Sequence, residues 1–250
     1  MTLMSEGRRL VPPDQGELAM SIFVNPTQFN DPNDLADYPR DEAGDLDKAA
    51  SVGVDMAFCP LDNNILYPPG ASTWVDVHGL DQHLCGATRP GHFRGVCTIV
   101  AKLWQLVEPD FSLFGEKDFQ QLAIIRRMHR DLFLRGEVVG VPTKREPDGL
   151  AMSSRNARLS PEARIQAQAL PRFLTLVRER FAAGERSIEG LLADAEQALQ
   201  PGEIHYVSAV DSARLVPVNT AGNGTLIAAA VSFAGVRLID NLVLSEAAPR

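Results

Sequence analysis

The sequence predicts an α/β fold with a parallel sheet, followed by a smaller α+β domain. Short continuous apolar runs alternate with helical patterns up to residue 142, whereas the rest of the chain has helices first and strands last. Continuous apolarity is typical of strands that are buried on both faces of a parallel sheet, and alternating strands and helices indicate a doubly wound arrangement. We therefore expect one domain over residues 1–143 and another over residues 144–250.

The first domain is predicted to alternate strands with helices. Each expected strand is an apolar run closed by turn residues, and the expected strands are Ser21–Asn25, Met56–Pro60, Phe111–Gly115 and Glu137–Pro142. The expected helices carry apolar residues three and four positions apart, and they are Asp41–Val52, Gly95–Val107 and Phe119–Leu134.

The second domain is predicted to begin with a helix. Ser160 is a favourable N-cap followed by a proline, and an apolar stripe continues until Gly184. Pro171 should kink or split this helix, because an interior proline costs about 3 kcal/mol. Ser187 is expected to cap a further helix that runs to about Leu199. The expected strands that follow are Ile204–Val210, Thr225–Phe233 and Val236–Leu244.

The composition is that of a globular protein, with 45% apolar and 22% charged residues in 250. A formal net charge of −8 argues against nucleic acid or an anionic membrane surface as the main partner, because both need a basic face. The longest strongly apolar run, Leu226–Val236, is too short to span a bilayer. No apolar core of the secretory kind occurs at the N-terminus, and the cysteines lack a CxxC spacing. We expect a cytoplasmic protein.

Polar side chains follow the first predicted strand. Asn25 and Gln28 come directly after it, and ligands of open α/β sheets lie beyond the carboxyl ends of the strands. Both amides can donate and accept hydrogen bonds, which suits a substrate that carries hydroxyl groups and a carboxylate. An ordinary Asn-Pro turn explains the segment equally well.

A second polar segment, Gly115-Glu116-Lys117-Asp118, lies between a predicted strand and a predicted helix. The glycine lets the backbone approach a ligand closely. Backbone N–H groups at a helix start attract anions, and the lysine adds a full positive charge. The alternative is a solvated helix start in which the two acidic residues only complement the helix dipole.

A third polar segment is Met152-Ser153-Ser154-Arg155-Asn156. Hydroxyl and N–H groups could surround a phosphate, and an arginine can bind it through two parallel hydrogen bonds. A polar turn is the alternative. With Lys117, this segment indicates a site that holds a polyphosphate between a lysine and an arginine. No Walker P-loop or GxGxxG pattern occurs in the chain, so the phosphate site would be of another kind.

A fourth segment places Arg89 and His92 in front of an apolar helix. A single histidine is more often structural than catalytic. This one has cationic neighbours at a helix N-terminus, which favours a role in anion binding.

Taken together, these segments identify a family. The chain reads Ser-Ile-Phe-Val-Asn-Pro-Thr-Gln-Phe, Tyr-Pro-Arg, Arg-Pro-Gly-His-Phe-Arg-Gly-Val, Phe-Gly-Glu-Lys-Asp-Phe-Gln-Gln and Asp-Gly-Leu-Ala-Met-Ser-Ser-Arg-Asn, and closes with Arg237-Leu-Ile-Asp240-Asn. In order and spacing, from Ser21 onward, it resembles the pantoate–β-alanine ligase (pantothenate synthetase) family.

The resemblance implies a Rossmann-like nucleotidyltransferase domain and a smaller C-terminal domain that closes over ATP. It implies a cytoplasmic, usually dimeric ligase of coenzyme A biosynthesis. Pantoate is activated as an acyl adenylate with release of pyrophosphate, β-alanine then displaces AMP, and magnesium accompanies the ATP. No nucleophilic side chain is required, because this chemistry is mostly positioning and charge stabilisation.

The resemblance also implies roles for individual residues. Pantoate binding falls on Asn25, Gln28 and Gln121. Arg89 and His92 would form part of the wall around the substrates. Lys117 and Arg155 are the expected catalytic residues, because they would stabilise charge on the phosphates. ATP binding falls on Gly115, Glu116, Lys117, Asp118, Lys144, Met152, Ser153, Ser154 and Arg155. The metal ligands stay unassigned.

One part of the family pattern is absent. The family carries a Pro-Thr-Met-Gly stretch and a His-x-Gly-His pair upstream of the Phe-Val-Asn-Pro strand, and the histidines of this chain form no such pair. Only residues 12–20 separate Val11 from Ser21, whereas a parallel crossover with its helix needs at least about 10–12 residues. A strand that ended at Val11 could therefore not be joined by a helix to a parallel neighbour, and we expect the first helix to be missing.

This absence predicts severely impaired adenylation and a sheet with one face uncovered. Losing a charge-stabilising donor costs about 10²–10³ in rate. A catalytically impaired or non-catalytic relative, which binds nucleotide or pantoate or pairs with a full-length subunit, is the alternative function. An altered reading frame of a longer enzyme would explain the short segment as well. An adenylyltransferase for another acid is disfavoured, because Gln28 and Gln121 are both present.

Overall fold

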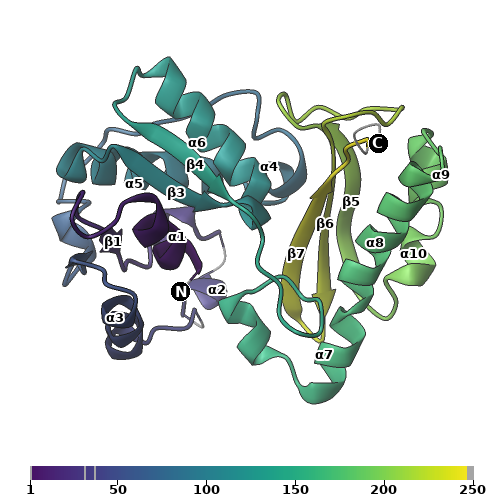
Figure 1. Ribbon diagram of the computed structural model, residues 1–250, viewed down its shortest axis with the longest axis horizontal. Helices are drawn as coiled ribbons and strands as arrows, with labels where there is room; N and C mark the ends of the chain where they lie inside the picture. The colour runs from purple at the N-terminus through teal and green to yellow at the C-terminus, as the bar shows by residue number, and fades with distance from the viewer. Residues whose placement is uncertain (1, 31, 37, 247–250) are drawn as a thin grey trace. The chain divides into compact units, whose positions relative to one another are not determined.

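The computed structural model describes residues 2–30, 32–36 and 38–246, and its contacts divide the chain into two compact units (Figure 1). Unit 1 comprises Met1–His78, Arg89–Glu116 and Ile124–Val141. Unit 2 comprises Gly79–Thr88, Lys117–Ala123 and Pro142–Arg250. The segments Gly79–Thr88 and Lys117–Ala123 thus belong to the same unit as the C-terminal part of the chain. The functional domains 1–143 and 144–250 stay a prediction.

Unit 1 alternates helices with short strands and so has the predicted α/β character. Its elements are α1 (Thr2–Leu10), β1 (Ala19–Ser21), α2 (Pro32–Ala36), α3 (Glu42–Ser51), β2 (Met56–Phe58), α5 (His92–Val107), β3 (Phe111–Gly115) and β4 (Glu137–Val141), with 3-10 turns at Pro26–Gln28 and Asn63–Ile65. Helix α6 (Phe119–Asp131) begins in unit 2 and continues in unit 1.

The strands of unit 1 form two separate parallel pairs in the described part of the chain, β1 with β2 and β3 with β4. Strand β3 lies at its predicted residues, and β4 ends one residue before the predicted limit at Pro142. Strand β1 lies earlier than predicted. Its pairing ends where the Ile22 N–H donates to the Phe58 carbonyl at 3.0 Å, because β2 itself ends at Phe58.

The single sheet that the sequence predicts is therefore discontinuous, and its strands are not buried on both faces. Among the residues of β1, β2, β3 and β4, Val141 alone is buried, and Met56 is 54% exposed. The prediction of doubly buried strands is wrong here. Residues 11–18 contain turns but neither helix nor strand, so the first strand pair gains no covering helix from this connection.

The chain before Val11 is a helix rather than a strand. Helix α1 packs against β3, and a Cβ placed on its Gly7 would lie 2.7 Å from Leu18 Cδ1 and 3.7 Å from Leu113 Cδ2. Leu18 precedes β1 and Leu113 lies in β3. Helix α1 therefore contacts both strand pairs, and glycine permits that close approach.

Arg8 fixes α1 to the first strand pair. Its guanidinium donates to the Gly53 carbonyl at 2.6 Å and to the carbonyls of Val11 and Gly16 at 3.2 and 3.3 Å. It also forms an ion pair with Asp55. Two hydrogen bonds hold the pKa of the Asp55 carboxyl below its ordinary value. The larger effect comes from the Leu18 N–H and the smaller from Arg8.

The helices of unit 1 form close to the predicted residues. Asp41 caps α3 by accepting from the Gly44 N–H, as expected for a short acid at an N-cap. Helix α5 starts three residues before the predicted Gly95, because Gly91 adopts a left-handed φ of 80° and turns the chain into the helix at His92. Helix α6 ends at Asp131 rather than Leu134.

Unit 2 has the predicted order of helices before strands. Its elements are α4 (Leu84–Thr88), the 3-10 turn Ser154–Arg158, α7 (Pro161–Ala167), α8 (Ala169–Ala182), α9 (Ile188–Leu192), α10 (Ala195–Ala198), β5 (Glu203–Asp211), β6 (Thr225–Phe233) and β7 (Val236–Val243). The strands form an antiparallel sheet in the order β5-β6-β7. Every residue of the central strand β6 is buried, as its continuous apolar sequence requires.

Helix α8 covers this sheet with the predicted apolar stripe (Figure 1). Ser160 caps α7 by accepting from the Ala163 N–H at 3.2 Å, and the expected split occurs at Gln168. Pro171 consequently lies in the first turn of α8, where a missing N–H leaves no hydrogen bond unmade. The helix predicted from Ser187 to Leu199 is broken into α9 and α10. In the described part of the chain, no helix has the length and apolarity that crossing a membrane requires.

The contacts of Arg8 predict its contribution to stability. We expect Arg8→Ala to destabilise unit 1 by roughly 2 kcal/mol, since several hydrogen bonds to backbone carbonyls are lost. Arg9→Ala is the matched control, because Arg9 is exposed and, among the residues that the structure describes, forms an ion pair with Glu6 of its own helix alone. Urea unfolding followed by tryptophan fluorescence measures the effect, since Trp74 and Trp104 both lie in unit 1. Equal midpoints for the two variants would contradict the role of Arg8.

Candidate active site

Asn25 is buried in unit 1, with 2% of its surface exposed. Its Nδ2 donates to the Gly95 carbonyl at 3.1 Å and to Gln28 Oε1 at 3.2 Å. Its Oδ1 accepts from Thr27 Oγ1 at 2.9 Å and from the Tyr67 hydroxyl at 3.0 Å. Asn25 therefore shapes the turn that carries Gln28, and its polar atoms are engaged within the chain.

Gln28, Arg89 and His92 lie together in unit 1. The Gln28 carbonyl accepts from Arg89 Nη2 at 3.1 Å and contacts His92 Nδ1 at 2.6 Å. A carbonyl oxygen only accepts, so Nδ1 must carry the proton. Arg89 Nη1 lies 3.5 Å from the other ring nitrogen, Nε2. Arg89 and His92, which lie before and at the first residue of α5, thus fix the Gln28 backbone.

Gly115 ends β3 and Glu116 follows it in unit 1. A Cβ placed on Gly115 would meet no atom within 4 Å. The backbone therefore borders open space, which is what close approach of a ligand needs.

Of the residues that follow Glu116 in unit 2, some side chains hydrogen-bond within the chain and others do not. Gln120 is buried and donates from Nε2 to the carbonyls of Leu80 and His83 at 2.9 and 2.8 Å. Lys117 and Gln121 are half-buried, and neither side chain hydrogen-bonds or pairs with any residue in the described ranges. Of the two neighbouring glutamines, Gln120 is structural and Gln121 is available to a ligand.

Residues 144–155 form a second backbone segment of unit 2. The Met152 N–H donates to the Lys144 carbonyl at 2.9 Å, and Arg145 pairs with Ala151 in an antiparallel bridge. Ser153 Oγ then accepts from the Arg155 N–H at 3.3 Å and caps the 3-10 turn. Ser153 is thus used locally, while Met152 and Ser154 are exposed.

Charged residues form ion pairs that hold the 144–155 segment to α7. Arg164 of α7 forms ion pairs with Glu146 and with Asp148, the latter at 2.7 Å. Asn156, which is 4% exposed, donates to Glu146 Oε1 at 2.6 Å and to the Ala151 carbonyl at 3.1 Å. The hydrogen bond from Arg164, and then that from Asn156, holds the pKa of Glu146 below its ordinary value of 4.5.

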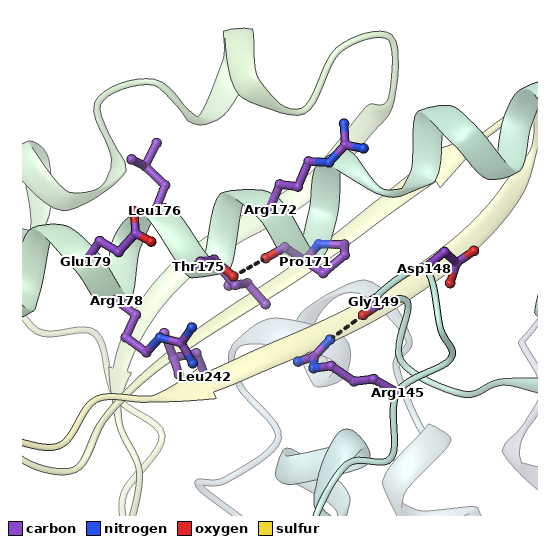
Figure 2. A pocket seen from close by; sticks show the side chains of 11 residues that line it. Arg145, Asp148, Gly149, Pro171, Arg172, Thr175, Leu176, Arg178, Glu179 and Leu242 are labelled. Carbon is purple, nitrogen blue, oxygen red and sulfur yellow. Dashed lines mark hydrogen bonds between the residues drawn. The ribbon is translucent and has the colours of Figure 1, made fainter.

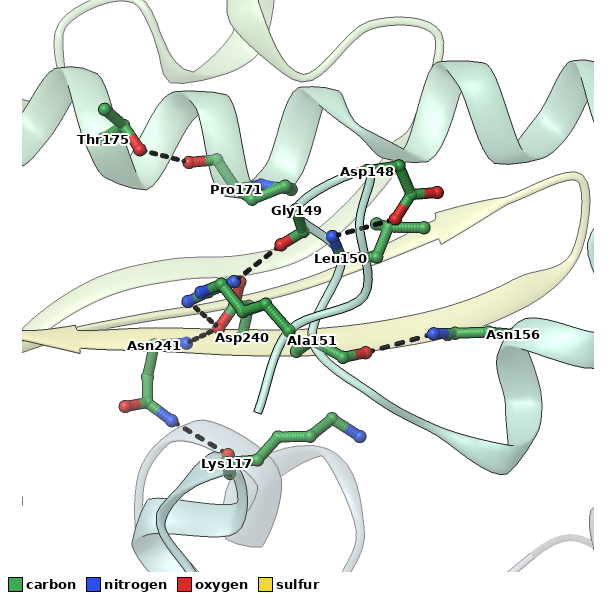
Figure 3. A network of polar contacts seen from close by, with 11 residues as sticks. Lys117, Asp148, Gly149, Leu150, Ala151, Asn156, Pro171, Thr175, Asp240 and Asn241 are labelled. Atoms are coloured by element: carbon green, nitrogen blue, oxygen red, sulfur yellow. Dashed lines mark hydrogen bonds and ion pairs between the residues drawn. The ribbon is translucent and has the colours of Figure 1, made fainter. Parts of the chain in front are cut away.

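Lys117 and Ser153 line the same small cavity of unit 2, together with Asn156 and Asp240. Lys117, Asn156 and Asp240 are drawn in Figure 3. The two segments that the sequence predicts to bind a polyphosphate therefore lie next to each other. Asn156 Oδ1 is buried in this region without a hydrogen-bond partner in the described part of the chain, and a buried polar atom of this kind is available to water or to a ligand.

A separate pocket of unit 2 lies between α8, the 145–149 turn and Leu242 (Figure 2). Arg172 and Arg178 line it with Arg145, but none of the predicted site residues does. Arg145 is engaged with the Gly149 carbonyl at 3.0 Å and with Asp240. This pocket therefore differs from the predicted polyphosphate site.

The structure thus brings the predicted residues together in two groups, each within one unit. Asn25, Gln28, Arg89 and His92 form the group of unit 1, with Gly115 and Glu116 at the end of β3. Lys117, Asp118, Gln121, Lys144, Met152, Ser153, Ser154 and Arg155 belong to unit 2. The individual ligand contacts predicted for these residues stay predictions. The sequence did not predict the residues that hold these segments in place, which are Arg145, Glu146, Arg164 and Asp240. The one feature that could have indicated them is a charged residue within an otherwise apolar or turn segment.

Parallel strand pairs followed by a helical and antiparallel unit correspond to the nucleotidyltransferase fold of the similar solved structures. The chain belongs to the pantoate-beta-alanine ligase family, whose model matches residues 3–243. The predicted family and fold class are confirmed, although the parallel sheet is divided.

Named relatives agree with this assignment. The pantothenate synthetase of Anaeromyxobacter dehalogenans is 50% identical over 245 residues, which cover 96% of this chain and 85% of the relative. That of Trichlorobacter lovleyi is 50% identical over 249 residues, which cover 98% of this chain and 86% of the relative.

Solved structures of the family superpose on the chain. The pantothenate synthetase of Thermus thermophilus has a TM-score of 0.90 and 43% identity, covering 97% of this chain and 87% of that one. The pantoate-beta-alanine ligase of Francisella tularensis, solved in complex with beta-gamma ATP and beta-alanine, has a TM-score of 0.78 and 30% identity. That match covers 96% of this chain and 83% of the other.

The lowered pKa of Glu146 predicts a pH dependence of unit 2. Because its pKa in the folded protein lies below the ordinary value of 4.5, the ionised carboxylate stabilises the fold fully above that value. The stabilisation is lost as the pH falls from 4.5 through the lowered pKa. We expect the free energy of unfolding at pH 7 to be larger for the parent than for Glu146→Gln. This difference in free energy should become smaller below pH 4.5.

Urea unfolding followed by circular dichroism measures this difference at each pH. Glu189→Gln on α9 is the control, since Glu189 lies in the same unit but takes no part in the ion pairs of Arg164 with the segment. A difference between parent and Glu146→Gln that does not change with pH would refute the assignment.

Proposed function

We propose that this chain condenses pantoate with β-alanine in an ATP-dependent reaction of coenzyme A biosynthesis. A pantoate carboxylate oxygen bonds to the α-phosphorus of ATP, and pyrophosphate leaves. The β-alanine amine then attacks the acyl carbon, the bond to AMP breaks, and pantothenate forms. The observation that carries the proposal is the family match over residues 3–243, which includes both polyphosphate segments of unit 2.

The charges of unit 2 suit the adenylation step. Pantoate and ATP are both anions, and negative charge grows on the departing pyrophosphate. Lys117 has no ion pair within the described residues, so its ammonium is available to this charge, and Arg155 follows the Ser153 cap next to the same cavity. Cations fixed near developing charge are the usual source of such catalysis. We assign the catalytic roles to Lys117 and Arg155.

The remaining roles are divided between the two groups of residues. We assign ATP binding to Gly115, Glu116, Lys117, Asp118, Lys144, Met152, Ser153, Ser154 and Arg155. Pantoate binding is assigned to Gln28 and Gln121. Asn25 shapes the turn that carries Gln28, because the five hydrogen bonds of its side chain leave little capacity for substrate. Arg89 and His92 would form the pocket wall.

Magnesium would enter with ATP as part of the substrate. No group of three or more histidine, cysteine, aspartate or glutamate side chains in the described ranges could form a protein cage for a metal ion. Magnesium commonly keeps several waters and binds to substrate phosphates with one or two carboxylates. Asp118 is exposed beside Lys117 and is the carboxylate best placed to take such a role.

A slower or absent adenylation step is the second candidate. It is favoured by the absence of a His-x-Gly-His pair and by the divided parallel sheet, in which residues 11–18 form neither strand nor helix. We expect adenylation to be about 10²–10³-fold slower for each charge-stabilising group of the family pattern that takes no part in the site. If no turnover remains, the chain would bind nucleotide or pantoate only, or pair with a full-length subunit.

The cytoplasmic location, the homodimer and the two functional domains 1–143 and 144–250 belong to the same proposal. They rest on the family resemblance. Sedimentation of the purified chain would test the homodimer.

Product release tests the reaction directly. With ATP, magnesium, pantoate and β-alanine, we expect both AMP and pyrophosphate; without β-alanine, pyrophosphate alone at a stoichiometric level. Each component is omitted in turn. Absence of both products from protein shown to be folded would leave the binding-only candidate.

Lys117→Ala tests the lysine. Loss of its ammonium is expected to lower the rate of pyrophosphate release about 10²–10³-fold, because the charge on the leaving group is no longer stabilised. Lys48→Ala is the matched control, since Lys48 is exposed on α3 and pairs with Asp45. Unchanged pyrophosphate release in Lys117→Ala would overturn the catalytic role.

A further inference from the structure

Two consecutive residues of β7 contact both segments to which we assign ATP binding. Asn241 donates from Nδ2 to the backbone carbonyl of Lys117 at 2.9 Å (Figure 3). Asp240 accepts from Arg145 Nη1 at 2.7 Å and from Nη2 at 3.1 Å. Lys117 belongs to one segment and Arg145 to the other, so neighbouring positions of one strand reach both.

The Asp240 carboxylate is held in a single orientation. It is 2% exposed, and a buried charge requires a well-formed partner. The bidentate pair with Arg145 supplies that partner, and Asp240 Oδ1 also accepts from the Asn241 N–H at 2.8 Å. The carboxylate is therefore fixed both to its own strand and to the guanidinium of Arg145.

Arg145 transmits this position to the segment that carries Ser153 and Arg155. Its Nη1 donates to the Gly149 carbonyl at 3.0 Å, and its backbone forms an antiparallel bridge with Ala151. Three residues separate Ala151 from Arg155, and the Ser153 cap is one of them. Displacement of Arg145 would therefore displace the phosphate-binding turn.

The Asn241 bond acts on the other segment. The acceptor of this hydrogen bond is the Lys117 carbonyl, which lies within the 3-10 turn Glu116–Asp118 before α6. A backbone carbonyl held in this way limits the positions that the Lys117 ammonium can reach. The side chain itself remains available to a ligand.

We propose that Asp240 and Asn241 are positioning residues, which hold the Lys117 segment and the 144–155 segment at a fixed separation on β7. Their role is exerted through the backbone of the Lys117 segment and the guanidinium of Arg145. Through them, Lys117 and the turn that carries Ser153 and Arg155 are held beside one cavity before ATP binds, and such preorganisation is what charge stabilisation requires. The proposal rests on the proposed function, because the separation matters only if both segments bind ATP.

Local hydrogen exchange of the ligand-free chain tests the positioning. Asn241→Asp keeps the size of the side chain but removes the donor, so we expect faster exchange in peptides covering residues 116–121 and unchanged exchange in β5. Arg145→Lys keeps the charge but loses the bidentate geometry, so faster exchange is expected in residues 144–156. Asn219→Asp is the control, because Asn219 is exposed in the same unit.

ATP kinetics provide the functional readout. Loss of one hydrogen bond corresponds to about a fivefold change in affinity. We expect the KM for ATP to rise about fivefold in Asn241→Asp, with the KM for pantoate within about twofold of the parent value. The melting temperature without ligand should stay close to that of Asn219→Asp. Asn241→Ala replaces Asn241→Asp if the latter does not fold.

Two results would overturn the proposal. One is unchanged exchange over residues 116–121 in the Asn241 variant. The other is faster exchange across the whole of unit 2 with equal increases in both KM values, which would mean that the residues only stabilise the fold. If the parent chain neither binds nor turns over ATP, the proposed function fails separately, and the local exchange results alone decide whether Asp240 and Asn241 position the two segments.

Discussion

The buried carboxylate of Asp240 is the interaction on which the arrangement of unit 2 depends. A charge at 2% exposure is tolerated only with a complete set of partners, and Arg145 can supply them only if the 144–152 segment lies along β7. The same strand binds the Lys117 carbonyl through Asn241. The antiparallel sheet, stabilised by the apolar face of α8, therefore serves as the rigid base for both polyphosphate segments.

Unit 1 depends on a different contact, the packing of α1. Its strands form two parallel pairs, and helix α1 contacts both pairs through the surface around Gly7. Arg8 contributes the polar half of that contact by pairing with Asp55 and binding backbone carbonyls. The polyphosphate segments are therefore supported within unit 2, while the strands of unit 1 are mostly half-buried or exposed.

Local patterns predicted much of the fold. Strands β3 and β6 occupy the predicted residues, because each is an apolar run bounded by turn residues, and Ser160 and Pro171 acted as their local preferences require. The prediction that the first helix is missing is wrong, because α1 precedes β1 and packs against β3. The division of the sheet was not predicted, since strand pairing depends on contacts distant in sequence. In the site, motifs identified Lys117 and Ser153, which share a cavity. They could not show that Asn25 is engaged within its turn or that Asp240 fixes Arg145, because both facts depend on tertiary contacts.

Pantoate-dependent exchange of labelled pyrophosphate into ATP is the measurement that isolates the adenylation step. The exchange needs ATP, magnesium and pantoate but no β-alanine, so it reports whether the cations of unit 2 stabilise the leaving pyrophosphate. We expect label to enter ATP only when pantoate is present. Folded protein that shows no exchange, or exchange that is independent of pantoate, would contradict the assignment of this chain as a pantoate-activating ligase.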